Sequence, residues 1–213
     1  MVTVVLSTIV AAVGLMRDDV AVIVGAMVIA PLLAPNVALS LAATLADAAL
    51  ARRAAVASVA GAAAALAASV VIGSLVAFDP VTPELLARSR VGLGDAALAL
   101  AAGSAGALAY TSGLPTAVIG VMVAVALLPP LVAAGLYLGA GHTALAAGAG
   151  LLTLTNVTAV NVAGVLTFLV QQVRPRTWWE EEKARKARRM ALAIWLFLLA
   201  VLVALMLWVV GEP

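Results

Sequence analysis

The stretch VIVGAMVIAPLLAP, from Val22 to Pro35, decides how this chain folds. It is apolar enough to lie in the hydrocarbon of a bilayer, yet it contains two prolines four residues apart, Pro31 and Pro35. Each proline removes a backbone donor and pushes the residue before it out of helical geometry. The stretch therefore predicts a helix that is interrupted inside a membrane.

The composition of the whole chain indicates an integral membrane protein. Of its 213 residues, 65% are hydrophobic and only 10% are charged, and the mean hydropathy is +1.20. So few charges cannot cover the surface of a soluble domain. Cysteine is absent, which excludes disulfides and thiolate metal sites. The net charge is +2 and the basic residues stand in short clusters beside apolar runs, which is typical of topology signals and not of a nucleic-acid surface.

The uncharged runs predict an all-α polytopic protein with about seven transmembrane helices in one domain, residues 1–213. A helix needs about 20 apolar residues to cross about 30 Å of hydrocarbon. The expected crossings are 1–16, 20–46, 54–78, two within 96–141 that divide at 111–115, 143–173 and 191–210. Residues 79–95 are expected to form an external loop, and residues 174–190 a cytoplasmic basic amphipathic helix that leads into the last crossing.

Charged and aromatic residues near the apolar runs predict the orientation. Basic residues flank the cytoplasmic ends of transmembrane helices, and the pair Arg52 and Arg53 is separated from the cluster at 174–189 by four expected crossings. An even number places both clusters on the same side. We therefore expect a multi-pass protein of the inner (plasma) membrane with a cytoplasmic N-terminus and an external C-terminus. Trp195 and Trp208 are expected to lie in opposite interfacial belts.

Two segments of the chain share one sequence frame. Residues 22–42 and 117–137 both carry G-x-M-V-x-x-x-L-L-x-P, and they belong to the second and fifth expected crossings. An odd offset gives the two copies opposite orientations, so we expect two inverted three-helix repeats, at about 1–78 and 96–173, plus one C-terminal helix. The residues of this broken-helix motif are Gly25, Met27, Pro31, Pro35, Gly120, Met122, Pro129 and Pro130.

The expected interruptions have two interpretations. Non-helical backbone at membrane depth is tolerated only where it is buried in protein or lines a water-filled cavity. Paired interrupted helices in two inverted halves are typical of a transport site. The alternative is an ordinary proline kink whose freed backbone groups are satisfied by neighbouring helices.

Polar side chains inside the expected crossings are few. Asp47 lies near Arg52 and Arg53, which favours an interfacial ion pair over a proton relay. The stretch 153–168 is rich in threonine and asparagine, and a primary amide such as that of Asn156 or Asn161 cannot satisfy all its donors and acceptors within its own helix. Five residues of separation turn two side chains about 140° apart, so these amides are expected to face different neighbours.

The same polar residues are the candidate binding site, with two roles left open. One is hydrogen bonding between helices, worth about 1 kcal/mol per bond, and the other is coordination of a substrate or ion. The candidates are Asn36, Ser40, Thr155, Asn156, Thr158 and Asn161. Carbonyls freed beside Pro31 and Pro129 could add cation ligands. The sequence contains no phosphate-binding loop, metal-ligand cluster or Ser/His/Asp set, so we expect no enzyme, no metal site and no cofactor.

Three stretches together resemble a known family. They are GAMVIAPLLAPNVALSLA, VAVALLPPLVAAGL and LTNVTAVNVAGVLTFL, and the likeness covers roughly Val20 to Val173. In them the chain is similar to the bacterial and archaeal hydrophobic membrane proteins catalogued as domain of unknown function 389, DUF389. The resemblance implies a membrane domain and no established activity. In that family, many members carry a soluble cytoplasmic domain before the membrane part.

These observations favour a secondary transporter or channel-like permease for a small solute or ion. Its site would lie between the two interrupted helices and the asparagine-rich sixth crossing. The alternative function is a non-transporting membrane scaffold or sensor module, in which proline and asparagine only specify packing. The expected partners are membrane lipids and the small solute or ion, with a second copy of the chain as a further candidate and no nucleic acid.

Overall fold

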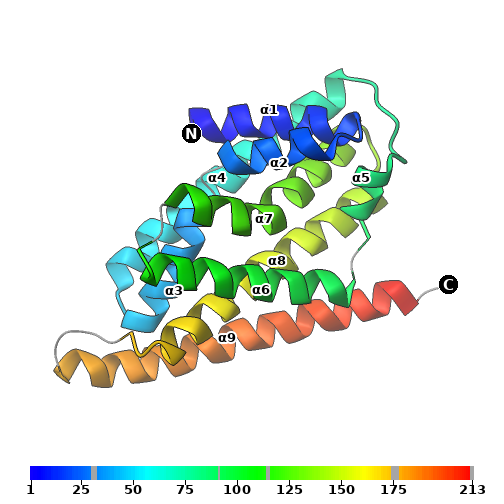
Figure 1. The fold of residues 1–213 in the computed structure, drawn as a ribbon. Helices are drawn as coiled ribbons and strands as arrows, with labels where there is room; N and C mark the ends of the chain where they lie inside the picture. Colours follow the sequence, from blue (N-terminus) through cyan, green and yellow to red (C-terminus); the bar gives the residue numbers. More distant parts are fainter. Residues whose placement is uncertain (30–32, 91, 114–115, 174–177, 212–213) are drawn as a thin grey trace.

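The computed structural model describes residues 1–29, 33–90, 92–113, 116–173 and 178–211, and every regular element in these ranges is a helix (Figure 1). The predicted all-α class is confirmed. The helices are α1 (Val2–Met16), α2 (Val20–Ile29), α3 (Leu33–Leu45), α4 (Ala48–Leu75), α5 (Pro83–Ala87), α6 (Leu93–Thr111), α7 (Thr116–Gly139), α8 (Thr143–Val170) and α9 (Trp178–Gly211).

Helix length and hydropathy identify the membrane-crossing elements. Within the described residues, 4 helices are long and apolar enough to cross a bilayer, namely α4, α6, α8 and the part of α9 from Arg188 to Trp208. The number rises to 5 if α2 and α3 form one broken span. Helix α1 (Val2–Met16) and the part of α7 from Ala126 to Gly139 are shorter apolar segments. These lengths fit a helical membrane protein with 4 or 5 candidate crossings, whereas the sequence predicts about seven.

Helix boundaries recur along the chain with a fixed spacing. The 28-residue helices α4 and α8 begin at residues 48 and 143 and end at residues 75 and 170. Helices α1 and α6 end at residues 16 and 111, again 95 residues apart. Helix α4 packs against α7, while α8 packs against α3. The third helix of each expected repeat therefore contacts the second segment of the other expected repeat.

The first proline-containing segment is bent. The axes of α2 and α3 differ by 53°. The 10 residues of α2 rise about 15 Å at about 1.5 Å per residue, roughly half of the hydrocarbon thickness. Pro35 is the third residue of α3, within the first turn, where a backbone N–H has no intrahelical partner and a proline costs no hydrogen bond. Pro31 lies outside the described residues.

The second proline-containing segment is not interrupted. Helix α7 continues through Pro129 and Pro130 to Gly139, so the prediction of a second broken helix is wrong. Both prolines are buried, and interior proline is tolerated in a membrane helix when neighbours satisfy the backbone groups that it frees. The tertiary environment of α7 therefore keeps it helical where local sequence predicts a break.

Close backbone packing holds α7 against α4. A methyl group added at Gly73 of α4 would collide with the backbone carbonyl of Leu136 on α7. One added at Gly135 of α7 would collide with the hydroxyl of Ser69 on α4. Small residues at such crossings let membrane helices approach closely, where dispersion is the main attraction.

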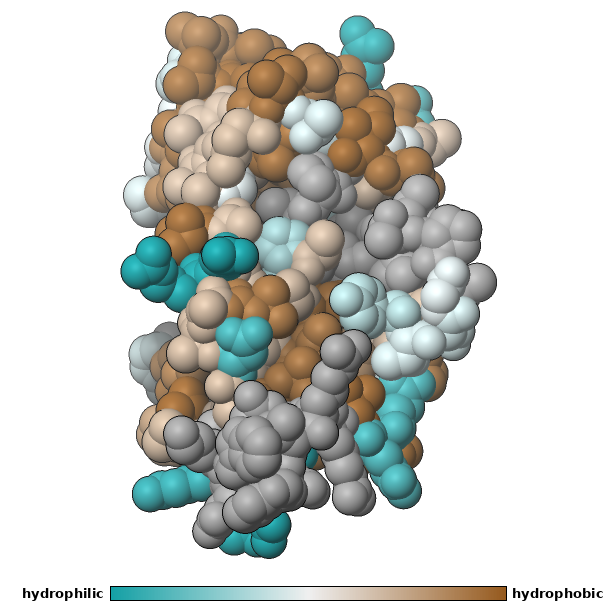
Figure 2. Space-filling model, turned by 90° about the vertical axis from the view of Figure 1, so that its left-hand side faces the viewer, coloured by the Kyte–Doolittle hydropathy of each residue, from teal (hydrophilic) through white to brown (hydrophobic). Residues whose placement is uncertain are grey.

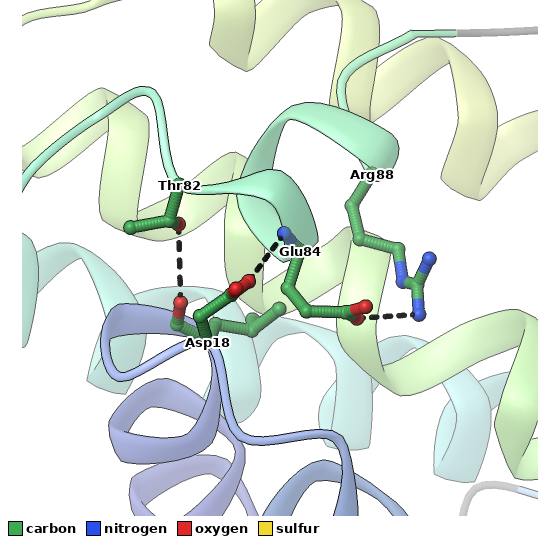
Figure 3. Close-up of polar contacts among 5 residues, drawn as sticks. Asp18, Thr82, Glu84 and Arg88 are labelled. Carbon is green, nitrogen blue, oxygen red and sulfur yellow. Dashed lines mark hydrogen bonds and ion pairs between the residues drawn. The ribbon is translucent and has the colours of Figure 1, made fainter.

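The expected external loop contains additional structure, which we call the α5 cap (residues 79–90). The carboxylate of Asp18 accepts a hydrogen bond of 2.8 Å from the backbone N–H of Glu84 (Figure 3). The hydroxyl of Thr82 donates to the carbonyl of Leu15 over 3.3 Å. Leu85 is fully buried in the same core as the end of α1. The cap therefore covers the α1–α2 turn as an ordered part of the fold.

Asp47 has a local role that differs from the expected ion pair. It is the N-cap of α4, and its carboxylate accepts a hydrogen bond of 2.9 Å from the backbone N–H of Leu50. Among the described residues the salt bridge that forms is Glu84–Arg88, at 3.0 Å. An aspartate at this position satisfies one of the N–H groups that a helix start leaves open. Asp47 is thus a helix cap and does not pair with Arg52 or Arg53.

The outer surface of the bundle is apolar where lipid is expected. Helix α9 covers the expected basic helix, from residue 178 on, and the last crossing in one continuous element. It exposes large hydrophobic side chains along its length, including Ile194, Phe197, Val201, Leu205 and Trp208. Figure 2 looks onto the left-hand end of the molecule in Figure 1. Hydrophobic residues dominate its upper part, and most hydrophilic residues lie from mid-height down to the lower edge.

Candidate functional site

Three of the predicted site residues meet between α3 and α8. The amide nitrogen of Asn161 donates to the side-chain oxygen of Asn36 over 3.2 Å. The hydroxyl of Ser40 lies 3.1 Å from the side-chain oxygen of Asn161 and 3.2 Å from the carbonyl of Asn36. All three residues are buried, with exposures of 5%, 1% and 0% for Asn36, Ser40 and Asn161. We call these three residues the Asn36–Ser40–Asn161 cluster.

Local helix geometry explains why the cluster forms. Asn36 and Ser40 lie one turn apart on α3 and therefore share a face. On α8, Gly164 lies one turn beyond Asn161, and a methyl group added there would lie 2.6 Å from the hydroxyl oxygen of Ser40. The missing side chain at Gly164 allows α3 to approach. Asn161 also donates to the carbonyl of Val157 over 2.8 Å, so both of its amide hydrogens are used.

Asn156 faces α7 and bonds to a backbone carbonyl that a proline leaves without its usual donor. Its amide nitrogen donates to the backbone oxygen of Ala126 on α7 over 2.7 Å. In a regular helix that oxygen would accept from residue 130, but Pro130 has no N–H to donate. Asn156 therefore supplies the donor that Pro130 lacks. The expectation that Asn156 and Asn161 face different helices is confirmed, with α7 on one side and α3 on the other.

The second polar atom of Asn156 is a buried acceptor without a partner. Its side-chain oxygen makes no hydrogen bond in the part of the chain that the structure describes, and the residue is only 5% exposed. A buried acceptor left unpaired costs roughly 1–3 kcal/mol. Such an atom is a natural point of attachment for a water molecule, a hydrogen-bond donor or a cation.

Ser7 takes part in the first bent segment and was not predicted. Its hydroxyl donates to the carbonyl of Ala26 over 2.6 Å, and Ser7 is fully buried. Ala26 lies in the last turn of α2, where the final carbonyls have no intrahelical donor. The sequence signal was a lone serine in an apolar run, which is weak because serine can equally bond to its own helix.

The predicted threonines bond to their own helix. The hydroxyl of Thr155 donates to the carbonyl of Leu151 over 2.9 Å and lies 3.6 Å from the sulfur of Met206 on α9. The hydroxyl of Thr158 donates to the carbonyl of Leu154 over 2.8 Å. Neither hydroxyl contacts the amides of the site in the described structure.

The structure describes the side-chain surroundings of only some residues of the predicted broken-helix motif. Met27 is buried and Gly25 is exposed on α2. The surroundings of Gly120 and the side chain of Met122 lie outside what the structure describes, although both positions belong to α7. The motif therefore contributes packing and backbone direction, and the polar chemistry comes from α3 and α8.

The long apolar helices and the exposed large hydrophobic side chains together indicate an α-helical integral membrane protein. The chain belongs to the family described as domain of unknown function (DUF389), whose model matches residues 27–162. The resemblance in the three sequence stretches is thereby confirmed. The chain is also 36% identical over 208 residues to the uncharacterized protein MJ0678 of Methanocaldococcus jannaschii.

The chain matches only part of that relative. The match covers 98% of this chain and 65% of the archaeal protein, so the chain spans about two thirds of its length. No solved structure matches the chain.

Proposed function

We propose that this membrane domain is a secondary transporter or channel-like permease for a small solute or ion. Its site would lie where α3, α7 and α8 meet, beside the bend between α2 and α3. The proposal includes two inverted three-helix repeats, an N-terminus in the cytoplasm, an external C-terminus and placement in the inner membrane. It assigns the chain no catalytic role.

The observation that carries the proposal is the arrangement at Asn156. Its nitrogen is engaged by the carbonyl that Pro130 frees, and its oxygen is buried without a partner among the described residues. This oxygen lies on α8, which also carries Asn161 of the Asn36–Ser40–Asn161 cluster. An acceptor of this kind suits a solute with a hydrogen-bond donor, or a cation, held beside the bend between α2 and α3.

A non-transporting scaffold is the second candidate, and a specific observation favours it. Asn161 uses both amide hydrogens and its side-chain oxygen within the protein. A polar cluster whose hydrogen bonds are all made within the protein can have a purely structural role. Hydrogen bonds between membrane helices contribute stability and specify which helices meet. The two candidates differ in whether Asn156 binds anything from outside the chain.

Flux through liposomes that contain the purified full chain tests the proposal. The screen covers monovalent cations, anions and small neutral metabolites. For the solute that is transported, Asn156→Ala should lower uptake by about tenfold, the effect of losing a hydrogen bond worth about 1.4 kcal/mol. Thr158→Val is the matched control, because that hydroxyl bonds only to its own helix, and its uptake should equal that of the wild type.

A second background separates folding from binding. In Pro130→Ala the restored N–H can satisfy Ala126, so removing Asn156 there no longer leaves that carbonyl unpaired. Uptake by Pro130→Ala/Asn156→Ala should fall well below uptake by Pro130→Ala alone. Equal uptake in the two chains, or no flux of any solute in wild-type liposomes, would support the scaffold.

A further inference from the structure

A pocket of about 260 Å³ lies where α3 ends, α4 begins and α9 passes. Its walls are mostly alanine side chains with Leu39, and Trp195 of α9 forms one side. Tryptophan is enriched where membrane helices meet the headgroup region. The pocket is therefore an apolar groove at the expected membrane interface.

Two arginines from distant parts of the sequence lie on helical faces that line this pocket. Ala48 of α4 lines the pocket, and Arg52 lies one turn beyond it on the same helical face. On α9, Ala191 and Trp195 line the pocket, and Arg188 lies on the same helical face, one turn before Ala191. The fold thus brings one arginine from each basic cluster, Arg52 and Arg188, onto helices that line the same pocket. Hydrophilic residues lie along the lower edge of Figure 2, on the side where α9 begins in Figure 1.

These two arginines have no carboxylate partner in the described structure. The ion pair that the described residues form, between Glu84 and Arg88, belongs to the α5 cap and not to this pocket. Asp47 also lines the pocket, but its carboxylate is engaged by the backbone N–H of Leu50 at the start of α4. Among the described side chains on these faces, positive charge therefore exceeds negative charge, and the guanidinium groups of Arg52 and Arg188 are available to an anion.

We propose that the groove between α3, α4 and α9 binds an anionic phospholipid. The phosphate would contact Arg52 and Arg188, and one acyl chain would lie along the alanine wall and Trp195. Basic pockets between transmembrane helices bind anionic headgroups, and each arginine near the surface contributes about 1 kcal/mol, roughly a fivefold change in affinity. A volume of 260 Å³ holds part of an acyl chain, so the rest of the lipid stays in the bilayer.

Lipid retention and thermal stability of the detergent-purified full chain test this site. The probes are a phosphatidylglycerol, a phosphatidylcholine with the same acyl chains, and glycerol 3-phosphate. Native mass spectrometry counts bound lipid, and melting curves give the apparent affinity. Phosphatidylglycerol should be retained and should raise the melting temperature, while the other two probes should not.

Two kinds of variant make the test specific. Arg52→Gln/Arg188→Gln should weaken phosphatidylglycerol binding by about 25-fold, because two fivefold steps multiply. Arg17→Gln/Arg90→Gln removes the same charge from exposed positions that do not line the pocket and should leave the affinity unchanged. Ala191→Phe keeps every charge but fills the groove, and it should also weaken binding.

The outcomes decide between sources of the anion. Equal protection by glycerol 3-phosphate would overturn the proposal in favour of a free-phosphate site. Equal retention of the two phospholipids, or unchanged binding in both the arginine pair and Ala191→Phe, would also overturn it. If one variant does not fold, the other still gives the answer.

Discussion

The segment α2–α3 and the helix α7 share a sequence frame but not a shape. Both carry G-x-M-V-x-x-x-L-L-x-P, with Pro35 and Pro130 in register. The first is bent by 53° between two helices, and the second is one helix of 24 residues. Proline alone therefore does not determine whether a membrane segment breaks.

The surroundings of each proline account for the difference. Pro35 lies in the first turn of α3, where no intrahelical bond is lost. Pro130 lies inside α7, and Asn156 supplies the donor that this proline removes. A side-chain donor from a neighbouring helix thus allows one copy to stay continuous, because a freed carbonyl inside a membrane needs a partner.

The segment α2–α3 and the helix α7 also differ in how they pack against α8 and α4, respectively. Ser40 of α3 faces Gly164 of α8, and Gly135 of α7 faces Ser69 of α4. Gly135 lies 95 residues after Ser40, and Gly164 lies 95 residues after Ser69, which is also the spacing between the helix ends. The two pairs therefore correspond in position, but serine and glycine are exchanged between them. Ser40 adds a hydrogen bond to Asn161, whereas Ser69 bonds to the carbonyls of Ala65 and Leu66 in its own helix.

The largest expected effect concerns the contact between α4 and α7. Gly73→Ala should destabilise the protein by about 3 kcal/mol, because the added methyl group meets the backbone of Leu136, which cannot rotate away. Gly25→Ala is the control, since nothing lies within 4 Å of its methyl position, and it should be neutral or slightly stabilising. Unfolding free energies in lipid–detergent micelles measure both. Similar values for the two variants would refute close packing at Gly73.

The next effect concerns the donor that keeps α7 continuous. Asn156→Leu should cost about 2 kcal/mol, because the carbonyl of Ala126 loses its partner inside the bundle. The cost should fall by about 1 kcal/mol in a Pro130→Ala background, where the backbone supplies the donor. The four unfolding free energies of this double-mutant cycle give the coupling. Additive effects would show that Asn156 does not compensate for the proline.

The smallest effect compares the two serine–glycine pairs. Gly135→Ser with Ser69→Gly conserves volume and removes only a bond within one helix, so it should be tolerated. Gly164→Ser with Ser40→Gly also conserves volume but removes the bond to Asn161, and it should cost about 1 kcal/mol more. Melting temperatures of the two double variants give the comparison. If the first swap costs as much as the second, the polar cluster adds nothing to the packing of α3.

Part of the candidate site could be predicted because its signals are local. Asn156 and Asn161 stand out in an apolar helix, and their spacing determines that they face different neighbours. Ser7 and the exact partner of Asn156 could not be predicted. Their partners are backbone carbonyls at Ala26 and Ala126, and a carbonyl carries no sequence signature. The α5 cap was missed for the same reason, since Asp18 binds a backbone N–H of Glu84.

By itself, the sequence determined that this is an all-helical membrane protein, that it belongs to its family, and that its prolines recur in one frame. Hydropathy, periodicity and composition are properties of neighbouring residues, so a single chain displays them. Only the tertiary structure decided which proline segment bends, which carbonyls receive a donor, and that Asp47 caps α4. These outcomes depend on groups that are distant in sequence and meet only when the helices pack.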